Sequence, residues 1–144
     1  MENLEEIIFY SLENAIKSYR QFAQRNITAS GIGITIDQWL IMKAISENAE
    51  ATQTEIADKV FKDTASLTRM IDLLIKKEYI LRKTHGNDRR RTELRLTNEG
   101  KKVLTRIQVI IKKNRSQALT GISQIKINET RKVLSTIITN CKAK

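Results

Sequence analysis

The sequence has no proline, five glycines and a single cysteine, Cys141, in 144 residues. Few positions therefore force a break in a helix, and one cysteine cannot form an intrachain disulfide. No uncharged run reaches the roughly 18 residues of a membrane-spanning helix, and the longest, residues 26–36, contains two glycines. The N-terminal stretch is acidic, where a signal peptide is basic. These absences predict a cytoplasmic protein with no membrane partner.

The charge is strongly positive and unevenly distributed. The formal net charge is +10 at pH 7, which favours polyanionic partners such as nucleic acid. Residues 76–95 contain eight Lys or Arg and three acidic residues, a balance of +5, whereas residues 1–14 contain four Glu and no Lys or Arg. These twenty residues therefore carry half of the net charge, which indicates a docking surface. A solvated basic face would have the same composition.

Apolar residues at steps of three and four predict a mainly helical fold. A first helix of about 22 residues is expected from Leu4 onward, followed by a turn at residues 28–33. Thr35, Thr52 and Asp63 are expected to cap three shorter helices. Two further helices are expected, one from Thr97 to about residue 119, and a last one whose apolar face contains Val133, Leu134, Ile137 and Ile138.

Between these helices the period changes to that of a β-hairpin. Residues 79–84 and 92–96 are expected to form two short strands, joined by a loop at residues 85–91 that contains three consecutive arginines. Gly86-Asn87 is expected to supply the turn. The predicted fold class is therefore mainly α with a small β-hairpin wing.

The helix predicted from Asp63 to Lys77 has an outer surface suited to DNA. Burying Leu67, Ile71 and Leu74 turns a set of small polar side chains and one arginine outward near the N-terminus of the helix. Such side chains let a helix approach base edges in a major groove. The outward set is Thr64, Ala65, Ser66, Thr68 and Arg69.

The wing supplies a second candidate contact. Arg89, Arg90 and Arg91 suit a minor groove, whose negative potential attracts guanidinium groups. Asp88 beside them is expected to orient one arginine through a bidentate ion pair.

The segment 37–100 resembles the MarR (multiple antibiotic resistance regulator) family of winged helix-turn-helix regulators. The resemblance rests on TQTEIADKV at 52–60, SLTRMIDLLIKKEYILRK at 66–83 and NDRRRTELRLTNEG at 87–100. The last is the most specific, because an Asp-Arg-Arg wing is followed at a fixed spacing by Leu-Thr and then Gly. By this match, Ser66, Thr68 and Arg69 fall where such proteins touch DNA, and Asp88 and Arg90 fall on the wing pair.

The resemblance also implies an assembly and a partner. It implies a homodimer built from an N-terminal dimerisation helix and turn at 1–34 and C-terminal dimerisation helices at 100–144, around a DNA-binding lobe at 35–99. The implied partner is double-stranded DNA carrying a pseudo-palindromic operator. Recognition helices would occupy successive major grooves, with the wings in the flanking minor grooves.

Members of this family often bind small aromatic or anionic effectors in a cleft near the first, second and fifth helices. Trp39 lies near the expected meeting point of these helices, and Tyr19 and Phe22 are placed to line the same space. Core packing for Trp39 and dimer packing for Tyr19 and Phe22 are the alternative interpretations. The sequence identifies no effector.

Three positions limit what the resemblance carries over. Glu78 stands where the family usually has glycine, so it either adopts a left-handed conformation or the helix ends differently. Cys141 has only Lys142 beside it, which is thin support for a reactive thiol. The isolated His85 is better explained as solvated or phosphate-facing than as a metal ligand, and no cofactor or metal site is predicted.

The sequence therefore predicts a transcriptional regulator, a repressor released by a small-molecule effector. The alternative is an architectural DNA-binding protein of weak sequence specificity, since the recognition helix is poor in Asn, Gln and Arg. A winged helix that binds only proteins would not need the three-arginine wing. An enzyme is excluded, because the sequence offers no nucleophile–base pair, glycine-rich phosphate loop or metal cluster.

Overall fold

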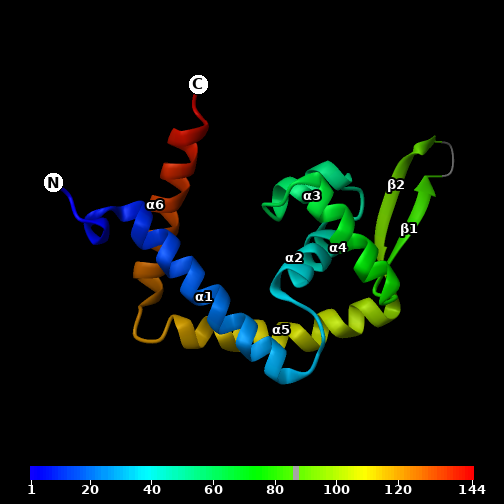
Figure 1. Ribbon diagram of the computed structural model, residues 1–144, viewed down its shortest axis with the longest axis horizontal. Helices are drawn as coiled ribbons and strands as arrows, with labels where there is room; N and C mark the ends of the chain where they lie inside the picture. Colours follow the sequence, from blue (N-terminus) through cyan, green and yellow to red (C-terminus); the bar gives the residue numbers. More distant parts are fainter. Residues whose placement is uncertain (86–87) are drawn as a thin grey trace. The chain divides into compact units, whose positions relative to one another are not determined.

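The computed structural model describes the backbone of residues 1–85 and 88–144, and the side chains outside residues 85–92. These residues form six α-helices, a short 3-10 helix and an antiparallel hairpin, which confirms the predicted fold class (Figure 1). The elements are η1 Leu4–Glu6, α1 Ile8–Ser30, α2 Ile36–Glu47, α3 Gln53–Lys59, α4 Thr64–Lys76, β1 Ile80–His85, β2 Asp88–Leu96, α5 Asn98–Ala118 and α6 Gln124–Lys142. The chain forms two compact units, residues 1–114 and 115–144.

The caps of the three shorter helices are as the sequence predicts. The Thr35 hydroxyl accepts a hydrogen bond from the Gln38 amide at 3.1 Å, and the Gln38 side chain accepts one from the Thr35 amide at 3.0 Å. Thr52 accepts from the Glu55 amide at 3.1 Å. Asp63 caps α4 in the same way. Each cap satisfies an amide that the helix itself leaves unpaired.

The first helix differs from its predicted bounds at both ends. Leu4–Glu6 form a separate 3-10 turn, because Ile7 is extended, and α1 begins only at Ile8. At the other end α1 continues to Ser30 and closes at Gly31, which has a left-handed backbone (φ 74°). The turn predicted at residues 28–33 is therefore shorter. The apolar step of four from Ala23 to Ile27 continues the helix into the predicted turn, and the glycine marks its end.

The hairpin is longer than predicted. β2 begins at Asp88, so the backbone of residues 88–91 belongs to a strand where a loop is predicted. The antiparallel register pairs Ile80 with Leu96 and Arg82 with Leu94, and it becomes irregular between Thr84 and His85. Residues 88–91 are all charged, so they lack the apolar–polar alternation by which a half-buried strand is recognised. The predicted turn at Gly86-Asn87 lies outside the described residues.

The five helices α1 to α5 and the hairpin all contribute residues to a single hydrophobic core. The face of α4 that the sequence assigns to the core is fully buried at Leu67, Ile71 and Leu74. Ile41 of α2 is also fully buried. Core residues from the other elements are Ala23, Ile27, Ile34, Ile36, Met42, Ile45, Ile56, Ala57, Val60, Ile80, Leu94, Val103, Leu104, Ile107 and Ile111.

A polar contact lies between α1 and α5, which cross each other in Figure 1. The Asn26 side chain donates to the Asn114 amide oxygen at 2.8 Å, and the Asn114 amide donates to the Ala23 carbonyl at 3.4 Å. Asn114 is only 2% exposed. A buried amide must find such partners, since an unpaired one costs about 1–3 kcal/mol.

The helices α3 and α4 both end at a non-glycine residue in the left-handed region. Phe61 has φ 60° and Glu78 has φ 65°. After α4, the Glu78 amide binds the Ile75 carbonyl at 2.9 Å and the Tyr79 amide binds the Leu74 carbonyl at 3.0 Å. Glu78 therefore adopts the left-handed conformation, the first of the two possibilities that the sequence left open for this position. That conformation costs an L-residue about 1–2 kcal/mol, and Phe61 adopts it while its side chain stays exposed.

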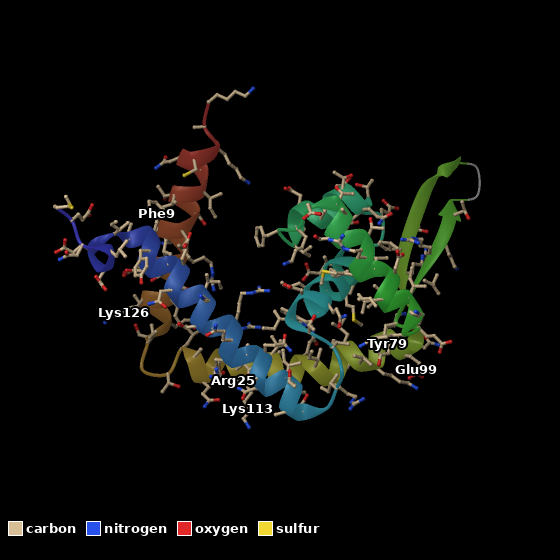
Figure 2. All side chains as sticks on the ribbon, viewed as in Figure 1. Phe9, Arg25, Tyr79, Glu99, Lys113 and Lys126 are labelled. Carbon is tan, nitrogen blue, oxygen red and sulfur yellow. The ribbon has the colours of Figure 1, made fainter. Side chains whose placement is uncertain are left out.

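The start of α5 is fastened to the end of α4. The Thr97 hydroxyl accepts from the Gly100 amide at 2.9 Å, which caps α5 as predicted, and donates to the Glu78 carbonyl at 2.6 Å. The helix approaches so closely that a Cβ at Gly100 would lie 2.1 Å from the Tyr79 carbonyl oxygen. Figure 2 shows Tyr79 and Glu99 close together at this junction. Only glycine fits here, which explains the Gly of the wing motif.

The second unit, residues 115–144, contains α6 and has no fully buried apolar residue. The Ser123 hydroxyl caps α6 by accepting from the Lys126 amide at 3.3 Å. None of the residues of α6, all of them described, is buried, and the exposed ones include Ile125, Val133 and Ile138. Cys141 is exposed near its end. None of the helices that the structure describes combines the length and apolar composition needed to cross a membrane.

Replacing Gly100 with Ala is expected to destabilise the protein, because the added methyl group overlaps backbone that cannot rotate away. We expect a loss of about 2–3 kcal/mol in the free energy of unfolding, measured by urea denaturation. The exposed neighbour Lys101 serves as a control, and Lys101→Ala should change stability by less than about 0.5 kcal/mol. Equal stabilities for the two variants would contradict the close approach to Tyr79.

Candidate nucleic-acid interface

The outer surface of α4 has the exposure that the sequence predicts. Burial of Leu67, Ile71 and Leu74 on one side leaves Thr64, Ala65 and Arg69 exposed, while Ser66 and Thr68 are half-buried. All five predicted residues therefore lie within the first two turns of one helix, away from the core. The surface is small and polar, and it carries one long cationic side chain.

A chain of hydrogen bonds orders the N-terminus of α4. Asp63 accepts from the Ser66 amide at 2.7 Å and from the Ser66 hydroxyl at 2.9 Å. The Ser66 hydroxyl in turn accepts from the Arg69 guanidinium at 3.3 Å. The two hydrogen bonds from Ser66 are the main causes that lower the pKa of the Asp63 carboxyl. Arg69 is thus held along the helix surface by the residue that caps it.

Two of the three hydroxyls on α4, those of Ser66 and Thr68, already donate a hydrogen bond within the chain. The Ser66 proton goes to Asp63, and the Thr68 hydroxyl donates to the Thr64 carbonyl at 2.9 Å. A hydroxyl that donates inward still offers acceptor lone pairs outward. Ser66 and Thr68 therefore present acceptors to a partner, and Arg69 is the long donor among the five residues.

The base of the hairpin is attached to α4 by an ion pair. Arg82 of β1 contacts the Asp72 carboxylate of α4 at 3.1 Å, and Leu94 of β2 is buried in the core. The backbone of residues 88–91 continues from this anchored base as part of β2. The side chains of Asp88, Arg89, Arg90 and Arg91, and the ion pair predicted among them, lie outside the described residues.

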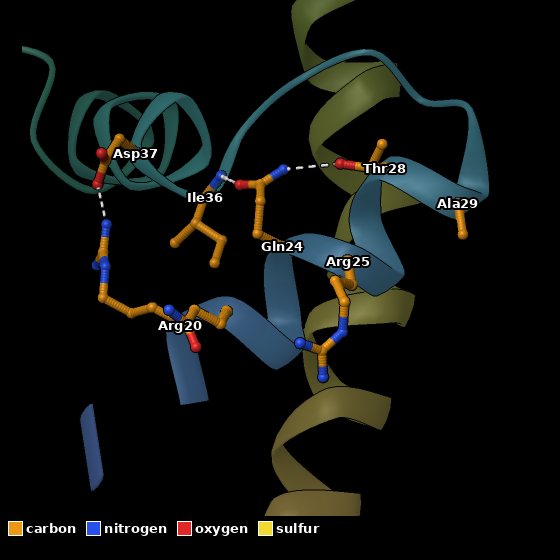
Figure 3. Close-up of a pocket in the computed structure, with 8 residues that line it drawn as sticks. Arg20, Gln24, Arg25, Thr28, Ala29, Ile36 and Asp37 are labelled. Carbon is orange, nitrogen blue, oxygen red and sulfur yellow. Dashed lines mark hydrogen bonds and ion pairs between the residues drawn. The ribbon is translucent and has the colours of Figure 1, made fainter. Parts of the chain in front are cut away.

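An open groove of about 720 Å³ lies between α1 and the start of α2. Gln24 crosses it, because its side chain accepts from the Ile36 amide at 3.0 Å and donates to Thr28 at 3.2 Å. Figure 3 shows Arg20 reaching Asp37 across this groove, with Arg25 on the other side of Gln24. The remaining lining residues are Gln21, Thr28, Ala29 and Ile36.

Asp37 binds two cations from different parts of the chain. Its Oδ1 atom pairs with the Arg20 guanidinium of α1, and its Oδ2 atom lies 3.2 Å from the Lys62 ammonium, just before α4. Burial works to raise the pKa of the Asp37 carboxyl, but the hydrogen bonds and attraction from Arg20 and Lys62 outweigh it and lower the pKa. Asp37 is therefore ionised at neutral pH.

The candidate effector residues lie beside the core and not in this groove's lining. Tyr19 and Trp39 are half-buried and pack against the core, and Phe22 is half-buried on α1. The Trp39 ring nitrogen is buried and has no hydrogen-bond partner in the described part of the chain. Among the same residues no three His, Cys, Asp or Glu side chains gather as a metal site.

Sequence reasoning missed the residues that brace α4. Asp37, Arg20 and Lys62 come from three separate segments, so their meeting follows from the tertiary fold and not from any spacing along the chain.

Phe61 has an exposed fraction of 89% and precedes the Asp63 cap by two residues. Its exposure has no sequence signal, because phenylalanine ordinarily indicates core.

Comparison with known proteins connects this geometry to a family. Residues 34–92, which span α2 to the start of β2, match the sequence model of the MarR family. The chain is 32% identical over 103 residues to a putative transcriptional regulatory protein for the hcr operon of Thauera aromatica, covering 72% of this chain and 61% of that protein. It is 24% identical over 123 residues to the HTH-type transcriptional regulator SarZ of Staphylococcus epidermidis, covering 85% of this chain and 71% of SarZ.

The fold also matches a solved structure over its whole length. BpsR of Bordetella bronchiseptica, described in a study of how 6-hydroxynicotinic acid regulates its DNA binding, superposes with a TM-score of 0.86 at 15% identity. The match covers 100% of this chain and 99% of BpsR. At this identity the likeness shows the fold.

Replacing Asp63 with Asn should reduce the loss of stability in acid. A depressed native pKa means that the ionised cap stabilises the fold above the ordinary carboxyl pKa of about 3.9, and that this contribution is lost as the pH falls through the lower native value. Asn still caps but does not titrate. We expect the thermal midpoint of the unaltered protein to fall more steeply than that of Asp63→Asn between about pH 5 and pH 2.

The exposed Asp58 provides a variant of equal charge, Asp58→Asn, which should keep the steep acid slope of the unaltered protein. Slopes that do not differ between the unaltered protein and Asp63→Asn would mean that Ser66 does not bind this carboxylate.

Proposed function

Because this chain belongs to the MarR family of transcriptional regulators, we propose that it is a dimeric repressor that binds a pseudo-palindromic operator and is released by a small-molecule effector. The observation that carries the DNA-binding part is the outer surface of α4. It is polar, it lies beside a wing with three arginines, and a buried apolar face holds it in place.

The proposed contacts divide between the two grooves of the duplex. Thr64, Ala65 and the acceptor hydroxyls of Ser66 and Thr68 would approach base edges in the major groove, with Arg69 as the donor to guanine or phosphate. Arg89, Arg90 and Arg91 would enter the adjacent minor groove, with Asp88 orienting one of them. The excess of five positive charges in residues 76–95 supplies attraction that does not depend on sequence.

The uncovered apolar residues of the helices outside this lobe support a homodimer. Ile8, Phe9 and Ile16 of α1 each have more than half of their surface exposed, and so do Ile125, Val133 and Ile138 of α6. Monomeric proteins rarely expose this much apolar side chain on neighbouring turns. A second copy of the chain would bury these residues and present two recognition helices at once.

The groove between α1 and α2 is a candidate place for an effector. Its two arginines, Arg20 and Arg25, favour an anionic or aromatic acid, which agrees with the named regulator of BpsR. Tyr19, Phe22 and Trp39 remain the predicted aromatic contacts on the neighbouring core side. An effector that favours one spacing of the two recognition helices by a few kcal/mol would release the operator.

One observation favours the alternative of an architectural DNA-binding protein with weak specificity. Because the Ser66 and Thr68 hydroxyls donate within the N-terminal part of α4, direct reading of bases by donor groups rests on Arg69 and Thr64. An architectural protein would bind scrambled DNA nearly as well as any selected site. Selection of bound duplexes from random DNA separates the two functions, because only a regulator yields a motif with two-fold symmetry.

Replacing Arg69 with Ala is expected to weaken binding to the selected operator by about 1–3 kcal/mol if the guanidinium reads a base. Binding to scrambled DNA should change much less, as measured by fluorescence anisotropy at one salt concentration. Arg131 on α6 makes a similar single hydrogen bond, at 3.4 Å to Asn128, so Arg131→Ala controls for loss of one surface arginine. Equal losses on both duplexes would assign Arg69 to the phosphate backbone.

Replacing Ile138 with Glu is expected to dissociate the dimer, because a carboxylate would be placed within the apolar face of α6. The mass in solution, measured by light scattering at micromolar concentration, should shift toward that of one chain. Thr139 lies on the opposite side of α6, and Thr139→Glu should leave the mass unchanged. A monomeric unaltered protein would contradict the proposed assembly.

A further inference from the structure

The two ends of the recognition helix are held by the same short segment of chain. Lys62, just before the α4 cap, contacts the Asp37 carboxylate at 3.2 Å. Lys77, just after α4, donates to the Gly33 carbonyl through its ammonium group. Gly33 lies in the junction between α1 and α2, residues 31–35, and Asp37 lies four residues later in the first turn of α2. A shift of this junction therefore acts on both ends of α4.

Asp37 also connects α4 to α1. One carboxylate oxygen accepts from Arg20 of α1 and the other forms an ion pair with Lys62. The three side chains are 27–40% exposed. Because ion pairs at this level of exposure are individually weak, their effect on overall stability is small. They can still fix a position, since no other ion pairs of the described residues connect α1, through one shared carboxylate, to the turn before α4.

We propose that Asp37 is a positioning residue for DNA recognition. It sets the placement of α4 relative to α1 through Lys62 and Arg20, and thereby sets the preference for operator over other DNA. This inference rests on the proposed function, because it requires a protein that discriminates between duplexes. Arg20 and Asp37 also line the α1–α2 groove, so an anion that drew Arg20 away would act on the recognition helix through the same carboxylate (Figure 3).

The test compares the affinities for the selected operator and for a scrambled duplex in the variants Asp37→Asn, Lys62→Gln and the double variant. Asp37→Asn removes a negative charge and should leave binding to scrambled DNA equal or tighter, while the operator-to-scrambled ratio falls about five- to tenfold. Lys62→Gln should weaken binding to both duplexes and lower the ratio by a similar factor. The double variant should lower the ratio no further than Asp37→Asn does, because both act through one contact.

Two controls separate positioning from charge and from loss of fold. Glu47→Gln removes an acid from the same helix whose ion pair, with Lys43 at 3.7 Å, stays within α2, and it should leave the ratio unchanged. Asp37→Glu keeps the charge and should restore most of the ratio. Thermal unfolding and mass in solution, measured on every variant, identify any loss of folded dimer.

The possible results have distinct meanings. If Asp37→Asn changes the affinities for operator and scrambled DNA by the same factor, the positioning role is overturned. A common increase would reflect charge alone, and a common decrease would reflect unfolding. So does a ratio that Asp37→Glu fails to restore. If the unaltered protein itself shows no preference between the duplexes, the proposed function fails first and the role of Asp37 fails with it. If the unaltered protein prefers the operator and Asp37→Asn has the same operator-to-scrambled ratio, only the role of Asp37 is overturned.

Discussion

The burial of one face of α4 is the interaction on which the candidate interface depends. Leu67, Ile71 and Leu74 are spaced by four and three residues, so their complete burial turns the residues between them outward. Each contributes about 1.5–3 kcal/mol of hydrophobic stabilisation, more than any polar contact on the outer surface. The outer residues are therefore free to differ without loss of the fold, which is what a surface that reads varied sequences requires.

The polar contacts around α4 have a different effect from this apolar anchor. Hydrophobic burial keeps the helix against the core but tolerates small rotations and shifts. Directional contacts from Lys62, Lys77 and Thr97 restrict these movements, and they come from segments before and after the helix. Two of the three lead to the α1–α2 junction, beside the groove. Both ends of α4 therefore contact the segment that borders the groove.

The sequence predicted the fold class, the helix caps and the outward set on α4, because each depends on local periodicity or on a side chain three residues away. It placed residues 88–91 in a loop, since four consecutive charged residues lack the alternation by which strands are recognised. The role of Gly100 was visible only as part of a motif, and the structure supplies its cause in the Tyr79 carbonyl. Asp37 could not be predicted, because its partners Arg20 and Lys62 are 17 and 25 residues away.

The Asn26–Asn114 contact has a consequence for how α1 and α5 align. Two helices joined only by aliphatic side chains can slide by one turn and bury a similar area, so that several alignments have nearly equal energy. Asn114 removes this freedom, because any other alignment leaves its buried amide without the Asn26 and Ala23 partners. A single polar residue in an apolar seam selects one register in the same manner in coiled coils. The pair therefore selects one alignment of α1 with α5, and with it the position of the α1–α2 junction relative to α5.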